Sequence, residues 1–237
     1  MNLKCNRCYL QDFKPKLFFH PKETIQPITW EKYIKKSKYL KKDRITFNSD
    51  YEKIDQKSIN DIPFYGSVTH NEYFTDLVYI FIYPINPGYY ICGKNVGFHT
   101  ADIEHIIIRI NNLTNIITKV YFSCHSKEHQ IYKPQDLYFD ENNHLKVFVS
   151  LHSHANYNKC KTFYRIMGFA NDKTKENGVV WYPKKVIDIS TMKKTHLKTI
   201  GTNNKNKFCV AGLFNRKFTF DKYYKITKLK RFFLPFI

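Results

Sequence analysis

The sequence predicts a mainly β protein: an antiparallel β-sandwich with a short N-terminal helix and extended terminal arms. Many short runs of β-branched and aromatic residues, separated by turns rich in Asn, Asp and Gly, favour this class, and few segments show helical spacing. The length of 237 residues favours one domain, and a hydrophobic fraction of 43% with 18 Tyr and 20 Phe supplies a core. This composition excludes an intrinsically disordered chain.

The chain begins with a polar and basic segment. Residues 1–16 contain Pro15, which indicates an extended arm. Residues 17–21 predict a short apolar strand that ends at a proline, and helical spacing predicts one short helix over residues 27–36. Residues 35–61 are rich in charge and predict an exposed connection.

Strands are predicted through most of the remaining chain. Residues 77–83 form a continuous apolar run that stops at Pro84, as expected of a core strand, and residues 103–110 have the same character. Further strands are predicted at residues 116–123, 137–139, 145–151, 179–182 and 207–214. Candidate core positions are Val78, Ile80, Ile82, Ile106, Ile108, Ile110, Val147, Val149 and Val179.

Three parts of the chain follow from these elements. They are an N-terminal arm at 1–16, a β-sandwich domain at 17–215 and a basic, aromatic C-terminal tail at 216–237. The tail is too apolar to be a solvated chain end, so we expect it to pack on its own domain or on a neighbour.

The charge balance is strongly basic, with 39 Lys and Arg against 20 Asp and Glu. Such a field attracts nucleic acid, anionic lipid or acidic partners, although an AT-rich genome produces the same residue bias. Without a recognised reader module, no specific nucleic-acid binding is expected. No apolar run approaches the ~20 residues that span a bilayer, and the N-terminus has no apolar core of a secretion signal. We therefore expect a soluble protein without a signal peptide.

The six cysteines are spaced too widely for a small secreted disulfide framework. Cys5 and Cys8 form one Cys-x-x-Cys pair, which is half of a zinc-ribbon pattern and lacks its second half. The more specific alternative to a zinc site is a disulfide bond from this arm to a neighbouring molecule.

One segment near the middle of the chain is the richest in groups that could do chemistry. On a strand, Asp102 and Glu104 point to the same face, so two carboxylates can converge on a divalent cation while His99 adds a nitrogen ligand. A later segment places His152 and His154 on one face. The alternative is that all of these are exposed or hydrogen-bonded polar residues without a ligand.

Five motifs occur in order along about residues 17–190. They are His20-Pro-Lys-Glu23 followed by Pro27 and Trp30, Gly-x-His-x-x-Asp-x-Glu-His at 97–105, Val-Tyr-Phe-Ser-Cys-His-Ser at 120–126, Val-Ser-Leu-His-Ser-His-Ala at 149–155, and Gly-Phe-Ala-Asn-Asp at 168–172 with Trp181. Together they resemble the vacuolar protein sorting-associated protein 62 family. The resemblance implies a β-sandwich with motif residues at strand ends, converging at one rim: His99, Asp102, Glu104 and His154. Further polar candidates for the same site are His125, His152 and Asp172.

The central motif also resembles the heart of necrosis-inducing proteins, whose β-sandwich binds a divalent cation through such residues to act at membranes. Here Ile103 stands where those proteins carry an aromatic residue, and Ala101 stands where they carry His. The resemblance implies a polar site on a β-sandwich, with a divalent cation as its candidate cofactor.

We weigh a structural function first. A small, basic, Tyr-rich chain resembles in type the polyhedrins, the occlusion-body proteins of insect viruses such as nudiviruses. This hypothesis predicts a dense lattice inside an infected host cell, in nucleus or cytoplasm, and later in extracellular occlusion bodies, with the chain itself and virions as partners. The arm, the tail and disulfides of Cys5 or Cys8 would join the copies. Because Lys and Tyr titrate near ~10, alkali should dissolve the lattice.

Two other classes compete with the lattice. One is a divalent-cation-dependent binder of membranes or glycans, and the other is a metal-dependent hydrolase with a bound water as nucleophile. The sequence has no Ser-His-Asp order, P-loop or dinucleotide fingerprint, so an enzyme is the weaker expectation.

Overall fold

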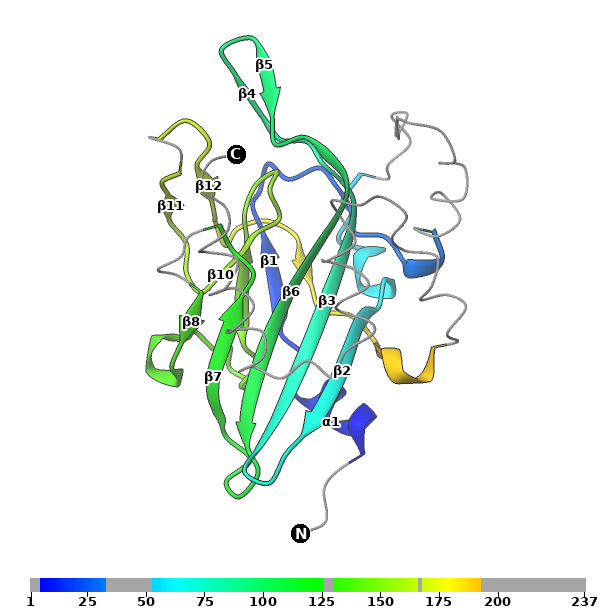
Figure 1. Cartoon of the computed structure of the whole chain (residues 1–237). Helices are drawn as coiled ribbons and strands as arrows, with labels where there is room; N and C mark the ends of the chain where they lie inside the picture. Colours follow the sequence, from blue (N-terminus) through cyan, green and yellow to red (C-terminus); the bar gives the residue numbers. More distant parts are fainter. Residues whose placement is uncertain (1–4, 33–52, 126–129, 166–167, 193–237) are drawn as a thin grey trace, which may run out of the picture.

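Two sheets form the body of the protein, seen in a computed structural model that describes residues 5–32, 53–125, 130–165 and 168–192 (Figure 1). The larger sheet has the strand order β14 (Val186–Asp188), β2 (Phe64–His70), β3 (Phe74–Asn86), β6 (His99–Asn111), β7 (Ile117–Phe122) and β8 (Ile131–Tyr132). The smaller has the order β10 (Asn156–Tyr157), β9 (Lys146–Val149), β1 (Lys16–Phe19) and β13 (Val180–Trp181). Most neighbours are antiparallel, and β14–β2 and β1–β9 are parallel. The predicted mainly β sandwich is confirmed.

The long strands β3 and β6 are buried on both faces, which explains their unbroken apolar runs. On β3, Leu77 and Tyr79 face the smaller sheet, whereas Val78 and Ile80 face a second apolar cluster with Trp30. The three consecutive isoleucines at 106–108 on β6 are fully buried, as expected of a central strand.

Aromatic packing fills the space between the sheets. Trp181 of β13 meets Phe64 of β2 edge-to-face with ring centroids 4.6 Å apart, and it lies 6.4 Å from Phe19 of β1. Edge-to-face pairs of this kind add to the free energy gained from burial. All the predicted core positions are buried except Val179, which is half-buried against the same cluster.

The segment predicted as an extended arm folds back instead. Residues Asn6–Asp12 form helix α1, and its Leu10 is completely buried. Gly66 of β2 makes room, because a Cβ there would lie 2.7 Å from a Leu10 methyl carbon. Tyr79 then donates a hydrogen bond to the Leu10 carbonyl at 3.1 Å. One apolar side chain and one special glycine therefore override the polar composition that suggested an arm.

Other predictions have mixed outcomes. Residues 30–32 are helical, within the predicted helix at 27–36, and the rest of that prediction, residues 33–36, lies outside the described residues. The predicted strand at 137–139 is only a single bridge, between Phe139 and Leu145. The predicted strand at 207–214 and the tail at 216–237 also lie outside the described residues.

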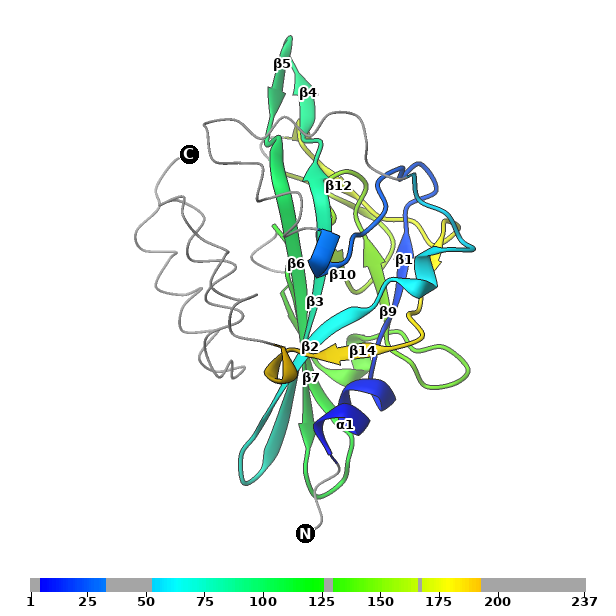
Figure 2. The same cartoon turned by 90° about the vertical axis from the view of Figure 1, so that its right-hand side faces the viewer.

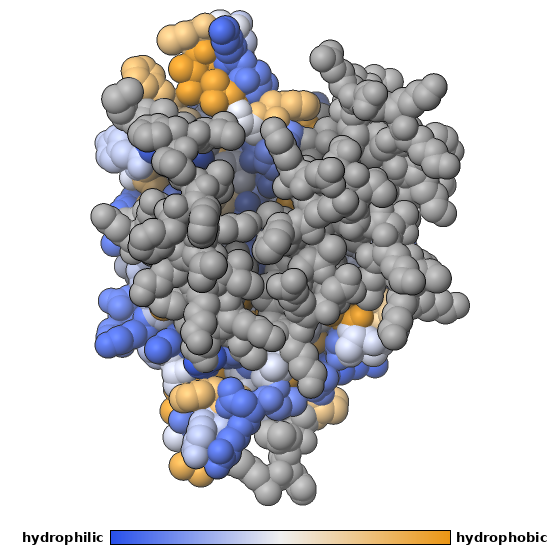
Figure 3. Space-filling view, viewed as in Figure 1, coloured by the Kyte–Doolittle hydropathy of each residue, from blue (hydrophilic) through white to orange (hydrophobic). Residues whose placement is uncertain are grey.

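A two-stranded hairpin, β4 (Tyr89–Ile91) and β5 (Lys94–Val96), continues from β3 and β6 and projects beyond the sandwich (Figures 1 and 2). In the space-filling view, hydrophobic (orange) and hydrophilic (blue) residues lie side by side at its tip (Figure 3), and Tyr90 is 79% exposed. A second pair, β11 (Thr162–Phe163) and β12 (Asp172–Lys173), lies at the same end of the molecule. Within the described residues, no helix combines the length and hydrophobicity needed to cross a bilayer.

Candidate functional site

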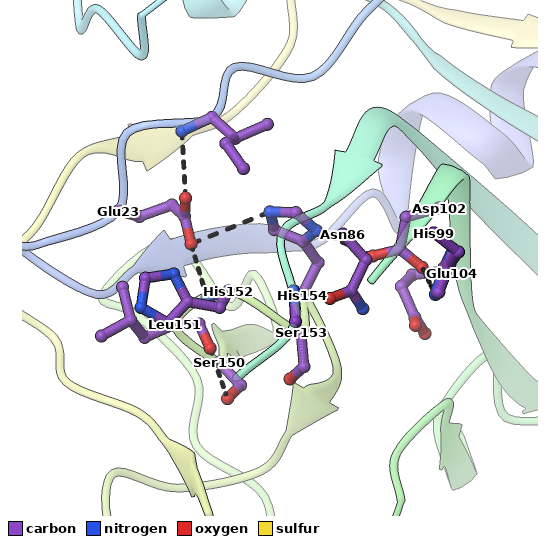
Figure 4. Close-up of polar contacts among 12 residues, drawn as sticks. Glu23, Asn86, His99, Asp102, Glu104, Ser150, Leu151, His152, Ser153 and His154 are labelled. Carbon is purple, nitrogen blue, oxygen red and sulfur yellow. Dashed lines mark hydrogen bonds and ion pairs between the residues drawn. The ribbon is translucent and has the colours of Figure 1, made fainter. Parts of the chain in front are cut away.

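A buried network joins three of the motif residues (Figure 4). His154, in the turn after β9, donates from Nδ1 to a carboxylate oxygen of Asp102 on β6 at 2.8 Å. Its Nε2 lies 3.7 Å from a carboxylate oxygen of Glu23, which comes from the loop after β1. All three side chains are nearly or fully buried. The network therefore ties together both sheets and the loop after β1.

The charges in this network compensate one another. Burial disfavours a charged imidazole, but the carboxylates of Asp102 and Glu23 outweigh it and raise the pKa of His154 to about 9. Burial likewise opposes the Glu23 carboxylate, yet His154 and backbone N–H groups lower its pKa to about 2. Those N–H groups belong to Thr24, Ile25 and His152, at 2.9–3.0 Å.

The remaining predicted ligands are near but do not complete a metal site. His99 is half-exposed, and its Nε2 lies 3.7 Å from Asp102. Glu104 accepts a hydrogen bond from Ser123, the residue directly after β7. The other oxygen of Asp102 is held by His154. Among the residues that the structure describes, no group of three or more His, Cys, Asp or Glu is arranged to hold a metal ion. In this arrangement the four residues do not fit a divalent cation.

A second buried carboxylate, Asp172 on β12, collects five donors. Its two oxygens accept hydrogen bonds from Tyr89 at 2.9 Å, Ser153 at 2.6 Å, Arg165 at 3.1 Å, Tyr157 at 2.5 Å and His125 at 3.0 Å. Burial would raise the pKa of Asp172, but His125, Arg165 and the hydroxyl donors hold it well below its usual range. We call Asp172 and its five donors the Asp172 hub.

The hub supports a pocket of about 260 Å³ at the base of the β4–β5 hairpin. The pocket is lined by Tyr89, Leu151, His152, Gly168, Phe169, Asn171 and Lys173. His152 has a φ of +67°, a left-handed conformation that is uncommon for a residue with a side chain. Such strained positions cluster at functional sites, which favours this turn as part of one.

Sequence reasoning found part of this geometry. Asp102, His154, His125, His152 and Asp172 were candidates, and the structure places them in two neighbouring networks rather than one metal site. Five residues that the two networks use had no role assigned from the sequence: Glu23, Tyr89, Ser153, Tyr157 and Arg165. Among them, Glu23 and Ser153 had a signal, because they lie in the motifs.

The cysteine pair lies apart from this site, at the start of α1. Cys5 caps the helix by accepting a hydrogen bond on Sγ from the Cys8 N–H at 3.3 Å. The Cys8 side chain, and after it this backbone hydrogen bond, lower the pKa of the Cys5 thiol. Both thiols are free and exposed, and the intermolecular disulfide stays a prediction.

Comparisons with known proteins agree with the motifs and with the fold. The model of the vacuolar protein sorting-associated protein 62 family matches residues 63–192, more than half of the chain. No curated protein sequence matches. Among solved structures, necrosis and ethylene inducing protein 2 from the causal agent of cocoa's witches' broom disease has a TM-score of 0.50 at 14% identity, covering 90% of this chain and 91% of its own. NLPPya in complex with glucosamine has a TM-score of 0.49 at 12% identity, covering 83% and 79%. The first of these two similarities shows the fold alone.

Proposed function

The chain belongs to the vacuolar protein sorting-associated protein 62 family, and on that premise we propose that it is a sugar-binding protein. The pocket at the base of the β4–β5 hairpin would hold one sugar ring of a glycan. This pocket is the observation that carries the proposal, because ligand sites are concave, rich in aromatic rings and supplied with a few polar groups.

The lining suits a sugar in size and in chemistry. A volume of about 260 Å³ lies just below the ~300–1,000 Å³ of pockets that hold larger ligands, so it suits a single ring. Tyr89 and Phe169 offer aromatic surface for the C–H face of a sugar, and Phe169 is 61% exposed. His152 and Lys173 supply polar groups beside these rings.

Hydrogen bonds hold the walls in place before any ligand arrives. Asn171 accepts from the Arg165 N–H at 3.0 Å and donates to the Gly168 carbonyl at 2.7 Å, which fixes the segment that carries Phe169. The Leu151 N–H donates to the Lys173 carbonyl at 3.0 Å and so joins two segments of the lining. A preformed pocket loses less conformational entropy on binding.

Titration calorimetry of the full-length chain against a panel of monosaccharides tests the proposal. We expect saturable binding of at least one sugar, weakened about 10-fold by Phe169→Ala through the loss of ~1.4 kcal/mol of ring contact. Tyr73→Ala is the matched control, because Tyr73 is 65% exposed just before β3, at the end of that strand away from the hairpin. Equal binding by both variants, or none by the unmodified chain, would refute the proposal.

Cation-dependent binding and metal-assisted hydrolysis receive less support. Both need a formed metal site, and one carboxylate oxygen of Asp102 and one of Glu104 are already engaged by His154 and Ser123. We therefore propose sugar binding without assigning a cation or a reaction to it.

Self-assembly into an occlusion-body lattice is the second candidate. Exposed free thiols at Cys5 and Cys8 are the observation that favours it, since they could link neighbouring copies. The comparisons give it no support, and the tail that it relies on lies outside the described residues. Sedimentation of the protein against pH, with and without reductant, tests it. A protein that stays monomeric at high concentration at pH 7 would defeat the lattice.

A further inference from the structure

The two carboxylates next to the pocket are closed to a ligand. Asp172 touches the pocket wall through Tyr89, and its two oxygens already accept from five donors. Glu23 touches the wall through the His152 N–H and accepts two further backbone N–H groups. An ionised carboxylate has about four acceptor positions, so Asp172 has none left for a sugar hydroxyl. Glu23 accepts three N–H groups and its side chain is only 1% exposed, so burial closes it to a sugar hydroxyl.

Several other acceptors in the wall already have a protein donor. The side-chain oxygen of Asn171 accepts from Arg165. The carbonyls of Leu151, Gly168 and Lys173 accept from Ser153, Asn171 and Leu151 respectively. A neutral sugar presents many hydroxyl donors, and at these wall positions they would share the acceptors with protein donors.

Donors, by contrast, remain free. Lys173 is exposed, and its ammonium has no hydrogen-bond or ion-pair partner within the described part of the chain. The ring of His152 contacts Tyr89 edge-on at 6.2 Å and leaves its nitrogens available among the described residues. Lys173 is also the one formally charged side chain in the lining, and the whole chain carries +19.

We propose that the pocket selects a sugar that carries an acidic group, a carboxylate or a sulfate. The inference rests on the proposed sugar-binding function and adds the class of ligand. The sugar ring packs on Tyr89 and Phe169 while its anionic oxygens, which only accept hydrogen bonds, meet Lys173 and His152. The positive field of the protein raises the local concentration of such ligands.

The experiment compares sugars that differ only in the acidic group. Full-length protein is titrated with glucose and glucuronate, and with galactose and galacturonate, at low and high ionic strength. We expect each acidic sugar to bind at least about 10-fold tighter than its neutral partner at low salt, with the difference shrinking at high salt. Acetate and sulfate alone serve as anion controls and should bind far more weakly than the acidic sugars.

Variants assign the effect to the pocket. Lys173→Gln should bring the acidic sugar to within about 2-fold of its neutral partner, since it removes the charge and keeps a similar length. Lys119→Gln is the control, because Lys119 is an exposed lysine on β7, away from the pocket lining.

The outcomes separate this inference from the proposed function. Equal binding of acidic and neutral sugars overturns the selection for acid and leaves sugar binding in place. Acetate or sulfate binding as tightly as glucuronate overturns it as well, because the ring would then contribute nothing. Binding of no sugar at all overturns the proposed function and this inference with it.

Discussion

The imidazole of His154 lies flat on the phenol ring of Tyr83, with ring centroids 4.0 Å apart and planes 4° from parallel. Both side chains are completely buried. Because Asp102 and Glu23 keep His154 charged, the stacked ring adds a cation–π attraction to the two carboxylates. A positive charge is thus held in a buried place from three sides.

We predict that Asp102→Asn destabilises the fold by about 3 kcal/mol or more. The substitution removes the nearer of the two negative partners and leaves the His154 charge poorly compensated in a buried place. Denaturant unfolding measures the change. Glu176→Gln is the control: it breaks the exposed Lys146–Glu176 pair and should cost less than about 1 kcal/mol. Similar losses for both variants would contradict a compensated buried charge.

The same network predicts a loss of stability in mild alkali. The pKa of His154 is raised from 6.5 to about 9 in the folded state, so the folded chain keeps a proton that the unfolded chain releases. The contribution is therefore complete below pH 6.5 and is lost as pH rises through about 9. The loss is at most about 3 kcal/mol. Unfolding free energies measured across this range should fall.

A second buried histidine supplies an internal control for that titration. Burial lowers the pKa of His105 to about 4, so its ring should stay neutral where His154 loses its proton. Side-chain NMR should show His154 titrating near pH 9 while His105 does not change. A His154 ring that titrates at or below its ordinary value would contradict the network.

The hydroxyl of Tyr83 predicts a stabilising substitution. This buried hydroxyl has no hydrogen-bond partner among the described residues, and its own burial holds its pKa well above the usual value. Tyr83→Phe keeps the stacked ring and removes the unsatisfied group, so we expect a gain of about 1 kcal/mol in unfolding free energy. Tyr79→Phe is the control, since it removes the hydrogen bond to the Leu10 carbonyl and should cost about 1 kcal/mol. Thermal unfolding of both variants decides the sign.

The central strands can be predicted from the sequence because strands that are buried on both faces consist of unbroken runs of apolar residues. β3 and β6 are continuous apolar runs, and burial on both faces needs such runs. Strand β2 was not predicted, because Gly66 and several polar residues interrupt its hydrophobic pattern. The two-residue strands, such as β12, are too short to show any hydrophobic periodicity in the sequence.

The site was harder to foresee than the fold. The motifs marked both Asp102 and His154 as candidates. That His154 donates a hydrogen bond to Asp102 follows only from the fold. Tyr89 reaches Asp172 from 83 positions away, a pairing that no local spacing encodes. Local patterns thus predict which residues are polar at strand ends, and topology decides which of them meet.

Gly178 is predicted to be irreplaceable. A Cβ at this position would lie 2.1 Å from the Phe19 carbonyl oxygen, in backbone that cannot move without disturbing β1. Gly178→Ala should therefore cost more than about 2 kcal/mol. Gly93→Ala, at the hairpin turn, meets no atom within 4 Å and suffers only from its φ of +78°, so we expect a loss of about 1 kcal/mol. Equal losses would show that β1 can shift to admit a methyl group.

Asp172→Asn tests whether the hub holds the pocket in shape. An amide has a single acceptor oxygen, and its N–H groups would face donors, so several of the five partners would lose their acceptor. We expect a stability loss of about 3 kcal/mol or more. Sugar binding should weaken as well, although Asp172 does not line the pocket, because Tyr89 would lose its anchor. Asp61→Asn, which breaks an exposed pair with Lys184, should leave both quantities within error. Unchanged sugar binding in a folded Asp172→Asn protein would mean that the pocket keeps its shape without the hub.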